Sequence, residues 1–444
     1  MEAALARLPK AALLQRIFLV GLISLFLALS VQYGNKVRGG GSAILRWRNQ
    51  LLDLGDENIY TRYAYPNPPI MALLLEPIAS LPPLVGSLLW FYLRIGMAVG
   101  ALLLFFRIIE TKEAPFPTWA KNLTILLSLR PIMGDLTHGN VNIYILFLVA
   151  AGLYAFHQRR DYLGGATIAL AIACKVTPAL FIPYFLWKRA WKALAGIVLG
   201  LFLFLFLVPS LFLGVGRNLE LLHSWTDQMV TPFVVQGVVT SEHQNQSLPG
   251  LLYRLTTASP SFLDEHADPM RYDNLLTLDH PTVKWILKGC MLAFAAMIVW
   301  SCRTPLSQRQ GWRLAAEFSL VMLGMLIFSE RTWKHHCVTM LAPFAVLSYY
   351  LAVCRPGRVL QGVLIALLVI ASLLMASTST SLFAHLDAKM AEVYGAYLWA
   401  IFVLVAAMVV LLSHRDAKAP GLAKPDVLSD KQRDGATILH TVGP

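Results

Sequence analysis

Charged residues are scarce in this chain, and this limits the kinds of protein it can be. Asp, Glu, Lys and Arg make up 14% of its 444 residues, whereas 57% are hydrophobic. Soluble globular domains carry about 25% charged residues, and disordered chains combine high charge with low hydrophobicity. The composition therefore excludes a typical soluble domain and an intrinsically disordered chain, and it indicates an integral membrane protein.

Cysteine is also scarce, and several well-known motifs are missing. The five cysteines lack the paired spacing of a metal site, and their odd number argues against a complete disulfide framework. The sequence has no Walker A loop, dinucleotide fingerprint or serine nucleophile elbow. It also lacks the internal period of a solenoid and an obvious inverted repeat. We therefore expect no metal site and no cofactor, with metal dependence left open.

Negative charge is in deficit, and the formal net charge is +12. In a soluble protein this excess would suggest nucleic acid as a partner. In an apolar chain it indicates orientation instead, because Lys and Arg collect in the cytoplasmic connections of membrane proteins. The topology given below puts almost all of the basic excess on the cytoplasmic side. We therefore expect the lipid bilayer, and no nucleic acid, as a partner.

Long apolar runs are abundant. A membrane-spanning helix needs about 20 mostly apolar residues, and no small-residue cleavage site follows the first run, so we expect it to be an uncleaved span. The uninterrupted candidates are 16–33, 84–107, 193–213, 284–301, 313–329, 337–354, 359–378 and 394–412. Together with the broken segments below, they predict an all-α polytopic membrane protein with about 10–12 crossings and both termini in the cytoplasm.

The connections between these runs suggest one domain. We predict a polytopic domain over residues 1–412, with outer loops at 34–83 and 214–283. Within the first loop, 69–81 is apolar but too short and too rich in proline to span, so we expect a helix at the outer surface. Residues 413–444 are polar, and we expect them to form a disordered cytoplasmic tail.

Two apolar segments are broken by polar residues at mid-segment. Residues 122–133 and 141–156 are separated by GDLTHGN, and residues 163–174 and 179–187 are separated by KVTP. Irregular backbone at membrane depth is tolerated only where protein or a water-filled cavity covers it. The two breaks are therefore predicted to be short re-entrant or broken helices that line an active-site cavity. The alternative is a pair of ordinary hairpins with tight outer turns.

Polar clusters on the predicted outer side supply the candidate chemistry. The LGDEN segment of the first outer loop contains three carboxylates, Asp53, Asp56 and Glu57. Each is suited to act as a general base for an attacking hydroxyl, although this composition is also that of a solvated turn. The GDLTHGNVN segment supplies groups that bond sugar hydroxyls or phosphate, namely Asp135, His138, Asn140 and Asn142.

Positively charged groups follow at two further places. Lys175 stands between two half-helices, where a lone lysine needs an anion such as a lipid phosphate or must snorkel to the interface. The SERTWKHHC turn suits a phosphate or a developing negative charge, or it is simply a basic outer turn. Its adjacent histidines do not share one helix face, so we prefer no metal there. The candidates are Arg331, Lys334, His335 and His336, with His243 and Gln246 of the second outer loop as carbohydrate-binding groups.

Taken in order, these motifs resemble glycosyltransferase family 87, whose members are polytopic GT-C enzymes. The resemblance covers most of residues 15–355. It rests on NIY…YPNPP, on HGNVN where the family typically has Gly-Gln-x-Asn, and on ACKVTPALFIPYFLWKRAW, HQNQSLPGLLYR and RTWKHH. It implies a GT-C-like fold in the cytoplasmic membrane with the active site on the extracytoplasmic side.

The resemblance also implies an activity. The family includes polyprenol-phosphate-mannose-dependent mannosyltransferases, which implies a hexosyltransferase that moves a sugar, such as mannose, from a polyprenyl-phosphate donor to a glycan or glycolipid acceptor. Lys175 and Arg331 would hold the donor phosphate, and His335 or His336 would assist at the donor or acceptor.

The resemblance leaves the general base open. The family's early acid falls on Ser42 in this chain. The base is therefore one of the three acids of the first outer loop, or Asp135, or the chain lacks the standard activity. Two alternatives to an active transferase stay open: a transporter or flippase for lipid-linked sugars, and an inactive protein that binds glycolipid.

Overall fold

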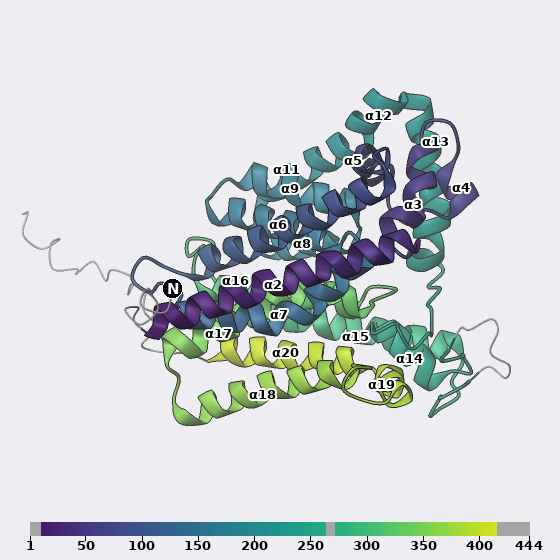
Figure 1. Cartoon of the computed structure of the whole chain (residues 1–444). Coiled ribbons are helices and arrows are strands. Elements are labelled where there is room, and N and C mark those ends of the chain that lie inside the picture. The colour runs from purple at the N-terminus through teal and green to yellow at the C-terminus, as the bar shows by residue number, and fades with distance from the viewer. Residues whose placement is uncertain (1–9, 263–270, 415–444) are drawn as a thin grey trace, which may run out of the picture.

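The chain folds into helices that run side by side along one direction (Figure 1). The computed structural model describes residues 10–262 and 271–414, and every regular element in these two stretches is a helix. The part of the predicted tail that follows His414 therefore lies outside the described residues. The predicted fold class is confirmed: this is an all-α polytopic membrane protein.

The first half of the chain contains α2 (Lys10–Arg38), α3 (Ala43–Leu52), α4 (Ile59–Tyr63), α5 (Pro69–Ala79), α6 (Pro83–Ile109), α7 (Thr118–His138), α8 (Asn142–His157), α9 (Asp161–Cys174), η1 (Thr177–Leu180), α10 (Phe181–Trp187), α11 (Trp191–Leu201), η2 (Phe202–Leu207) and α12 (Val208–Leu213). The second half contains α13 (Val215–Trp225), η3 (Thr226–Val235), α14 (Leu248–Thr256), α15 (His280–Ser301), α16 (Trp312–Ile327), η4 (Lys334–Met340), α17 (Leu341–Tyr349), η5 (Tyr350–Cys354), α18 (Arg358–Ser377), α19 (His385–Val393) and α20 (Ala396–Ser413).

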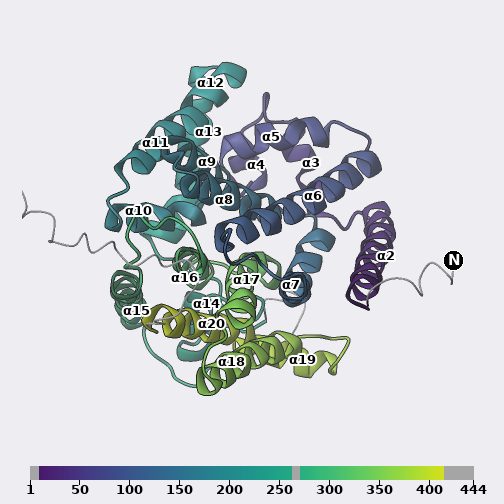
Figure 2. The same cartoon turned by 90° about the vertical axis from the view of Figure 1, so that its left-hand side faces the viewer.

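Among the described residues, seven helical segments are long and apolar enough to cross a membrane. They are Ala12–Arg38, Pro83–Ile109, Trp191–Leu213, His280–Ser301, Lys334–Cys354, Arg358–Ser377 and Ala396–Ser413. In Ala12–Arg38, only 6% of an apolar stretch of 18 residues is buried by other parts of the chain, whereas 78% of the corresponding stretch in Lys334–Cys354 is buried. Helix α2 accordingly stands at the rim of the bundle in Figure 2, where its apolar side chains face lipid, whereas α17 lies among other helices.

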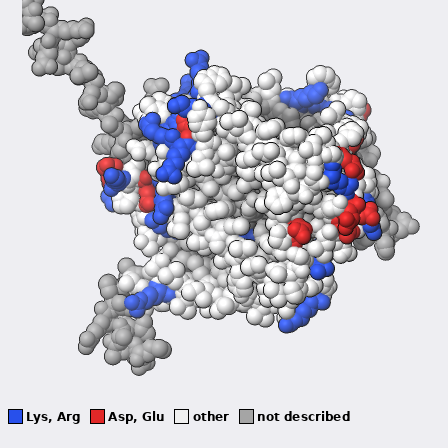
Figure 3. Space-filling model, turned by 90° about the horizontal axis from the view of Figure 1, so that it is seen from above, with Lys and Arg blue, Asp and Glu red and all other residues white. Residues whose placement is uncertain are grey.

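The bundle has two different ends. Helix α2 begins and α20 ends at the left end in Figure 1, and the short helices α3, α4, α13, α14 and α19 gather at the right end. Figure 3, seen from above, shows Lys and Arg concentrated toward the left, while much of the visible Asp and Glu lies toward the right. The right end is referred to below as the site end, because the candidate site lies there.

Helices α9 and α11 pack closely near the N-terminus of α9. A Cβ on Gly165 of α9 would lie 2.0 Å from the carbonyl oxygen of Ala193 on α11, and a Cβ on Gly196 would lie 2.4 Å from that of Tyr162. Glycine is therefore required for the backbones to approach this closely, as at many helix contacts in membranes. This contact lies in the first turns of α9, and the KVTP break follows the other end of the same helix.

The predicted break at KVTP and the short apolar helix of the first outer loop are both found. Helix α9 ends at Cys174, Lys175 has an extended backbone, and the chain resumes as η1 and α10. Helix α5 covers 11 residues with Pro69 at its first turn and Pro77 inside. The second outer loop, expected to be polar connection, contains α13, η3 and α14 in its described part.

The predicted break at GDLTHGN is shorter than expected. Helix α7 continues through this motif to His138 and is 21 residues long, so the expectation of a short piece ending at residue 133 was wrong. The helix persists because the polar side chain of Asp135 is paired inside the protein, with no exposure. Only residues 139–141 interrupt the helices there. Helix α19 was not expected at all.

Candidate functional site

The turn between α7 and α8 is built around Gly139, which adopts a left-handed conformation with φ of 76°. The carbonyl oxygen of Gly139 accepts a hydrogen bond from Nε1 of Trp90 at 3.1 Å. The guanidinium of Arg94, fully buried on α6, donates to the carbonyl oxygens of Asp135 at 2.7 Å and Leu136 at 3.1 Å. The carbonyl oxygen of Asp135 also accepts from the backbone N–H of Gly139 at 3.0 Å, so Arg94 adds a second bond there and gives the Leu136 carbonyl a partner at the end of α7.

The side chain of Asp135 joins this turn to the next helix. Its carboxylate lies 3.7 Å from Nη1 of Arg94 and accepts hydrogen bonds from Nδ2 of Asn142 at 2.8 Å and the backbone N–H of Ile143 at 3.2 Å. Asn142 in turn accepts a 2.6 Å hydrogen bond from Nζ of Lys175. A continuous chain of bonds therefore runs from a buried arginine to the lysine of the KVTP break.

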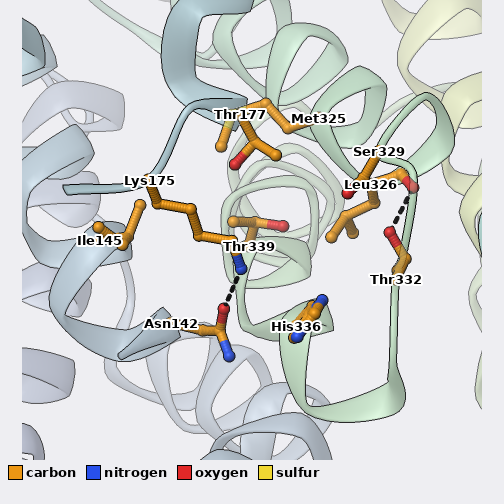
Figure 4. A pocket seen from close by; sticks show the side chains of 10 residues that line it. All are labelled: Asn142, Ile145, Lys175, Thr177, Met325, Leu326, Ser329, Thr332, His336 and Thr339. Atoms are coloured by element: carbon orange, nitrogen blue, oxygen red, sulfur yellow. Dashed lines mark hydrogen bonds between the residues drawn. The ribbon is translucent and has the colours of Figure 1, made fainter. Parts of the chain in front are cut away.

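Lys175 points into a small cavity at the site end (Figure 4). The cavity measures about 20 Å³, which is room for about one water molecule. Polar groups from four separate segments meet around it. Its lining residues are Asn142, Ile145, Lys175, Thr177, Met325, Leu326, Ser329, Thr332, His336 and Thr339.

His336 faces this cavity in a defined tautomer. The backbone N–H of Trp333 donates to Nδ1 of His336 at 3.3 Å. Because Nδ1 accepts this bond, the neutral ring carries its proton on Nε2. His336 and Lys175 line the same cavity, and the ring of His336 also makes a backbone hydrogen bond with Arg331. An imidazole N–H and the Nζ of Lys175 together suit an anionic oxygen.

His335 faces the opposite way and belongs to a stack of rings. Its ring lies parallel to that of His138, with centroids 4.3 Å apart and an interplanar angle of 17°. Nδ2 of Asn140 lies 3.0 Å from Nε2 of His335, and the amide oxygen of Asn140 accepts from the backbone N–H of Val141. The amide of Asn140 is thus the donor and the imidazole is the acceptor.

A second, larger pocket of about 380 Å³ opens beside this stack. The segment from Thr332 to His336 forms a shared wall, since it supplies residues to both cavities. The pocket is lined by Gly134, His138, His243, Gln244, Trp333, Lys334, His335, Thr380, Lys389 and Glu392. Aromatic rings, cations and a single carboxylate therefore surround a space large enough for a sugar residue.

The second outer loop holds this wall through buried amides. Oδ1 of Asn245 accepts from the backbone N–H of Thr332 at 2.9 Å, and its Nδ2 donates to the carbonyl oxygen of Glu330 at 2.9 Å. Nε2 of Gln246 donates to the carbonyl oxygens of His243 at 2.6 Å and Glu392 at 2.8 Å. Gln246 is fully buried and its amide is used on backbone, so it positions the loop, whereas His243 lines the larger pocket.

Arg331 lies outside the small cavity, close to an acid. Its Nε is 3.6 Å from Oε1 of Glu242, which also accepts a hydrogen bond from Nε1 of Trp333 at 3.1 Å. The neighbouring Glu330 lies in the same loop, where burial raises its carboxyl pKa against the opposing charges of Arg331 and Lys175. The loop therefore brings two cations and partly buried acids to the edge of the cavity.

Residues 65–329 of this sequence match the family model of glycosyltransferase family 87, which is more than half of the chain. The chain belongs to glycosyltransferase family 87. The match to the family model includes the α7–α8 turn, the KVTP break and the described part of the second outer loop. It ends before the two histidines of the shared wall.

Two curated relatives carry the same name, polyprenol-phosphate-mannose-dependent alpha-(1-2)-phosphatidylinositol mannoside mannosyltransferase. The protein of Mycobacterium tuberculosis is 24% identical over 292 residues, covering 63% of this chain and 61% of the relative. The protein of Mycolicibacterium smegmatis is 26% identical over 306 residues, covering 65% of this chain and 62% of the relative. The chain thus spans about three fifths of the length of these relatives.

The acids of the first outer loop precede the family match, and their contacts are local. The Asp53 carboxylate accepts a hydrogen bond from the Tyr63 hydroxyl. Glu57 forms an exposed ion pair with Arg62 at 2.8 Å, and Asp56 is exposed. Among the described residues, none of the three acids lines either cavity.

Ser42, at the position where the family resemblance expects an acid, lies next to the site. It caps the start of α3, is fully buried, and accepts a hydrogen bond from the Tyr33 hydroxyl at 3.2 Å. A Cβ on Gly139 would lie 3.3 Å from its Oγ. The chain thus brings a serine, which is not a base at neutral pH, to the turn that carries His138.

The structure therefore brings together most of the predicted binding residues. His138, Asn140 and Asn142 come from one turn, Lys175 from the KVTP break, and the 331–336 segment from the far side. Sequence reasoning missed Arg94, Glu242 and Glu392, which pair with residues distant in the sequence. Within the described ranges, no group of three or more His, Cys, Asp or Glu is arranged to hold a metal ion.

Proposed function

We propose that this chain is a membrane glycosyltransferase that moves a hexose from a polyprenyl-phosphate donor to a glycan or glycolipid acceptor. Membership of glycosyltransferase family 87 supports the reaction class, and the two relatives are named for polyprenol-phosphate-mannose. The observation that carries the proposal is the convergence of Lys175 and His336 on one cavity at a break between helices.

The cavity suits the leaving phosphate of such a donor. When the sugar is transferred, the bond between the anomeric carbon and the phosphate oxygen breaks, and a second negative charge develops on the phosphate. Prearranged donors stabilise such charge most strongly where water is excluded. The Nζ of Lys175 and the Nε2–H of His336 would supply this stabilisation, with Arg331 at the cavity edge. A phosphate is larger than the cavity, so binding requires side chains such as Leu326 to move.

The general base is a separate question. A carboxylate that takes the proton of the acceptor hydroxyl contributes about 10²–10⁴-fold to the rate. The acids proposed from the sequence are Asp53, Asp56 and Glu57, with Asp135 as a further candidate, and each stays a hypothesis that its Asn or Gln variant tests. His336 stays a candidate assistant at the donor.

We further propose that the protein resides in the cytoplasmic membrane with the site end outside and both termini inside. The concentration of Lys and Arg at the opposite end supports this orientation. A membrane-impermeant thiol reagent tests it. Cysteine replacing the exposed Gly55 should be labelled in intact cells, and cysteine replacing the exposed Gln158 should be labelled only after lysis.

The activity is tested with purified protein in lipid nanodiscs, labelled polyprenyl-phosphate-mannose and other polyprenyl-phosphate hexoses, and a panel of glycolipid acceptors. The expected result is a labelled acceptor product, reduced about 100-fold or more in Lys175→Met, in keeping with the loss of a charge-stabilising group. Absence of transfer from every donor, with movement of labelled lipid across vesicles instead, would show a flippase and overturn the proposal.

A further inference from the structure

Glu392 stands out among the carboxylates of the described chain because of where it lies. Among the residues lining the two cavities, it is the single acid. It belongs to α19, a helix at the site end that lies outside the residues matched by the family model. Its side chain is 7% exposed. A nearly buried carboxylate at the wall of a pocket is costly unless it has partners, so its surroundings decide its role.

The backbone around Glu392 is held firmly. Its carbonyl oxygen accepts hydrogen bonds from Nε2 of Gln246 at 2.8 Å and from Nη2 of Arg254 at 3.3 Å. Nε of Arg254 also donates to the carbonyl oxygen of Val393 at 2.7 Å. These bonds use buried side chains whose other groups are also bonded to backbone. The carboxylate therefore starts from a fixed point and needs little reorganisation to meet a substrate.

The two carboxylate oxygens have different surroundings. Oε1 accepts a hydrogen bond from Nζ of Lys334. Oε2 lies 3.8 Å from Nε2 of His243, beyond hydrogen-bonding distance. Burial lowers the pKa of His243 to about 4, so its ring is neutral near pH 7 and does not bind the carboxylate as a cation. Oε2 is therefore available to accept a proton from a ligand.

The walls around this carboxylate suit a sugar. Trp333 and the stacked rings of His138 and His335 offer apolar faces, and Lys389 offers a further donor. The shared wall brings this pocket next to Lys175 and His336 in the small cavity, because Thr332 and His336 line the small cavity and residues 333–335 between them line the larger pocket. An acceptor hydroxyl in the larger pocket would thus lie beside a donor phosphate in the smaller one.

We propose that the larger pocket binds the acceptor and that Glu392 is the general base of the transfer. This inference rests on the proposed function. In the step, Oε2 of Glu392 takes the proton of the acceptor hydroxyl, whose oxygen forms the new bond to the anomeric carbon. The bond from that carbon to the phosphate oxygen breaks, and its electron pair leaves with the polyprenyl phosphate. The proton on Glu392 then returns to solvent.

The experiment compares two buried glutamates that each pair with a lysine. Glu317, fully buried near the opposite end, lies 2.8 Å from Nζ of Lys188 and is the matched control for losing a buried ion pair. Glu392→Gln and Glu317→Gln are assayed as purified full-length protein in nanodiscs with labelled polyprenyl-phosphate-mannose. We expect kcat to fall about 100-fold or more in Glu392→Gln, with the KM for the donor unchanged. Glu317→Gln should keep the parental kcat per folded molecule.

Two further readouts separate catalysis from structure. In the parent, kcat/KM should fall at low pH as the base is protonated, and this acidic limb should vanish in Glu392→Gln. Glu392→Asp should recover part of the rate, because it keeps a carboxylate that is one methylene shorter. If Glu392 acts only through its ion pair with Lys334, Lys334→Met and Glu392→Gln should lose activity equally, and both should keep the parental pH profile. That result would overturn the inference.

The outcomes also separate this inference from the proposed function. Should the parent transfer no hexose from any donor, the proposed function fails and the inference fails with it. Should the parent be active while Glu392→Gln keeps more than about a hundredth of its kcat, only the inference fails, because general-base loss costs at least about 100-fold. Loss of turnover in Asp53→Asn, Asp56→Asn or Glu57→Gln alongside an active Glu392→Gln would assign the base to the first outer loop.

Discussion

The ion pair between Arg94 and Asp135 leads to a quantitative prediction about stability and activity. Both side chains are fully buried, and the guanidinium also bonds three backbone carbonyl groups of the α7–α8 region. Replacing Arg94 with Met leaves the Asp135 carboxylate buried without its cation. Breaking a buried pair in this way costs about 3–5 kcal/mol. We expect the free energy of unfolding of Arg94→Met to fall by that amount.

The double variant is expected to recover part of this loss. Arg94→Met combined with Asp135→Asn removes both charges, and the new amide oxygen can still accept from Nδ2 of Asn142. The remaining cost is that of unpaired backbone carbonyls, about 1–3 kcal/mol. The two substitutions should therefore couple by about 2 kcal/mol, within the usual range for residues in contact. Arg62→Met, which removes an exposed ion pair with Glu57, should cost about 0–1 kcal/mol and is the control.

Unfolding of each variant is followed by tryptophan fluorescence during SDS titration in mixed micelles, and transfer is measured on the folded fraction. The double variant should keep measurable transfer, because Asp135 orients Asn142 and does not touch the cavity. The reasoning is refuted if Arg94→Met loses less than about 1 kcal/mol, far below the cost of a broken buried pair. It is equally refuted if the double variant loses the sum of the single losses. A folded double variant without turnover would instead favour Asp135 as the general base.

Three further predictions concern charge, backbone and pH. Lys175→Arg should keep more transfer than Lys175→Met, since it retains the cation near the proposed donor phosphate; equal losses in initial-rate assays would argue against a charge effect. Gly139→Ala should destabilise the fold more than Gly40→Ala in SDS titration, because both glycines have φ of 76° but only at Gly139 would a Cβ meet a neighbour, the Tyr33 hydroxyl at 2.9 Å. His243 binds its proton less readily when folded, with a pKa of about 4 against an ordinary 6.5, so its contribution to stability should be complete above pH 6.5 and be lost as the pH falls toward 4. Chemical unfolding between pH 7 and 4.5 should show this loss, and His243→Gln should reduce it.

Much of the fold follows from local patterns in the sequence. Apolar length and proline predicted the short helix α5, and the polar KVTP motif predicted the break after α9, because each signal lies within the segment that it shapes. The same reasoning from local patterns predicts the wrong end for α7. Its polar motif looks like a helix break, yet Asp135 is compensated by Arg94, 41 residues away. A partner at that separation leaves no trace in the local pattern, so the pattern predicts a shorter helix than the structure has.

The candidate site shows the same division between local and distant information. The turn carrying His138, Asn140 and Asn142 and the break carrying Lys175 were predicted, because a polar motif inside an apolar run is visible in the sequence. The amide-rich HQNQ motif was expected to bind sugar, but the side-chain amide of Gln246 forms its hydrogen bonds with backbone groups. Its role depends on which chain segments approach it, and this is a property of the tertiary structure.

Glu392 illustrates the residues that sequence reasoning misses. The segment HLDAKMAEV is a short polar helix between two apolar runs, and nothing in its pattern separates Glu392 from Asp387, which lies in its first turn. The distinction comes from Lys334, 58 residues earlier in the chain, and from the buried amide and guanidinium that hold the backbone at residues 392 and 393. If an acid is needed beside the His138–His335 stack and Ser42 cannot serve, a carboxylate from another segment must enter the pocket. Among the described residues that line this pocket, Glu392 is the acid. The most informative experiment on this protein therefore compares the Glu392→Gln variant with variants of the three acids in the first outer loop.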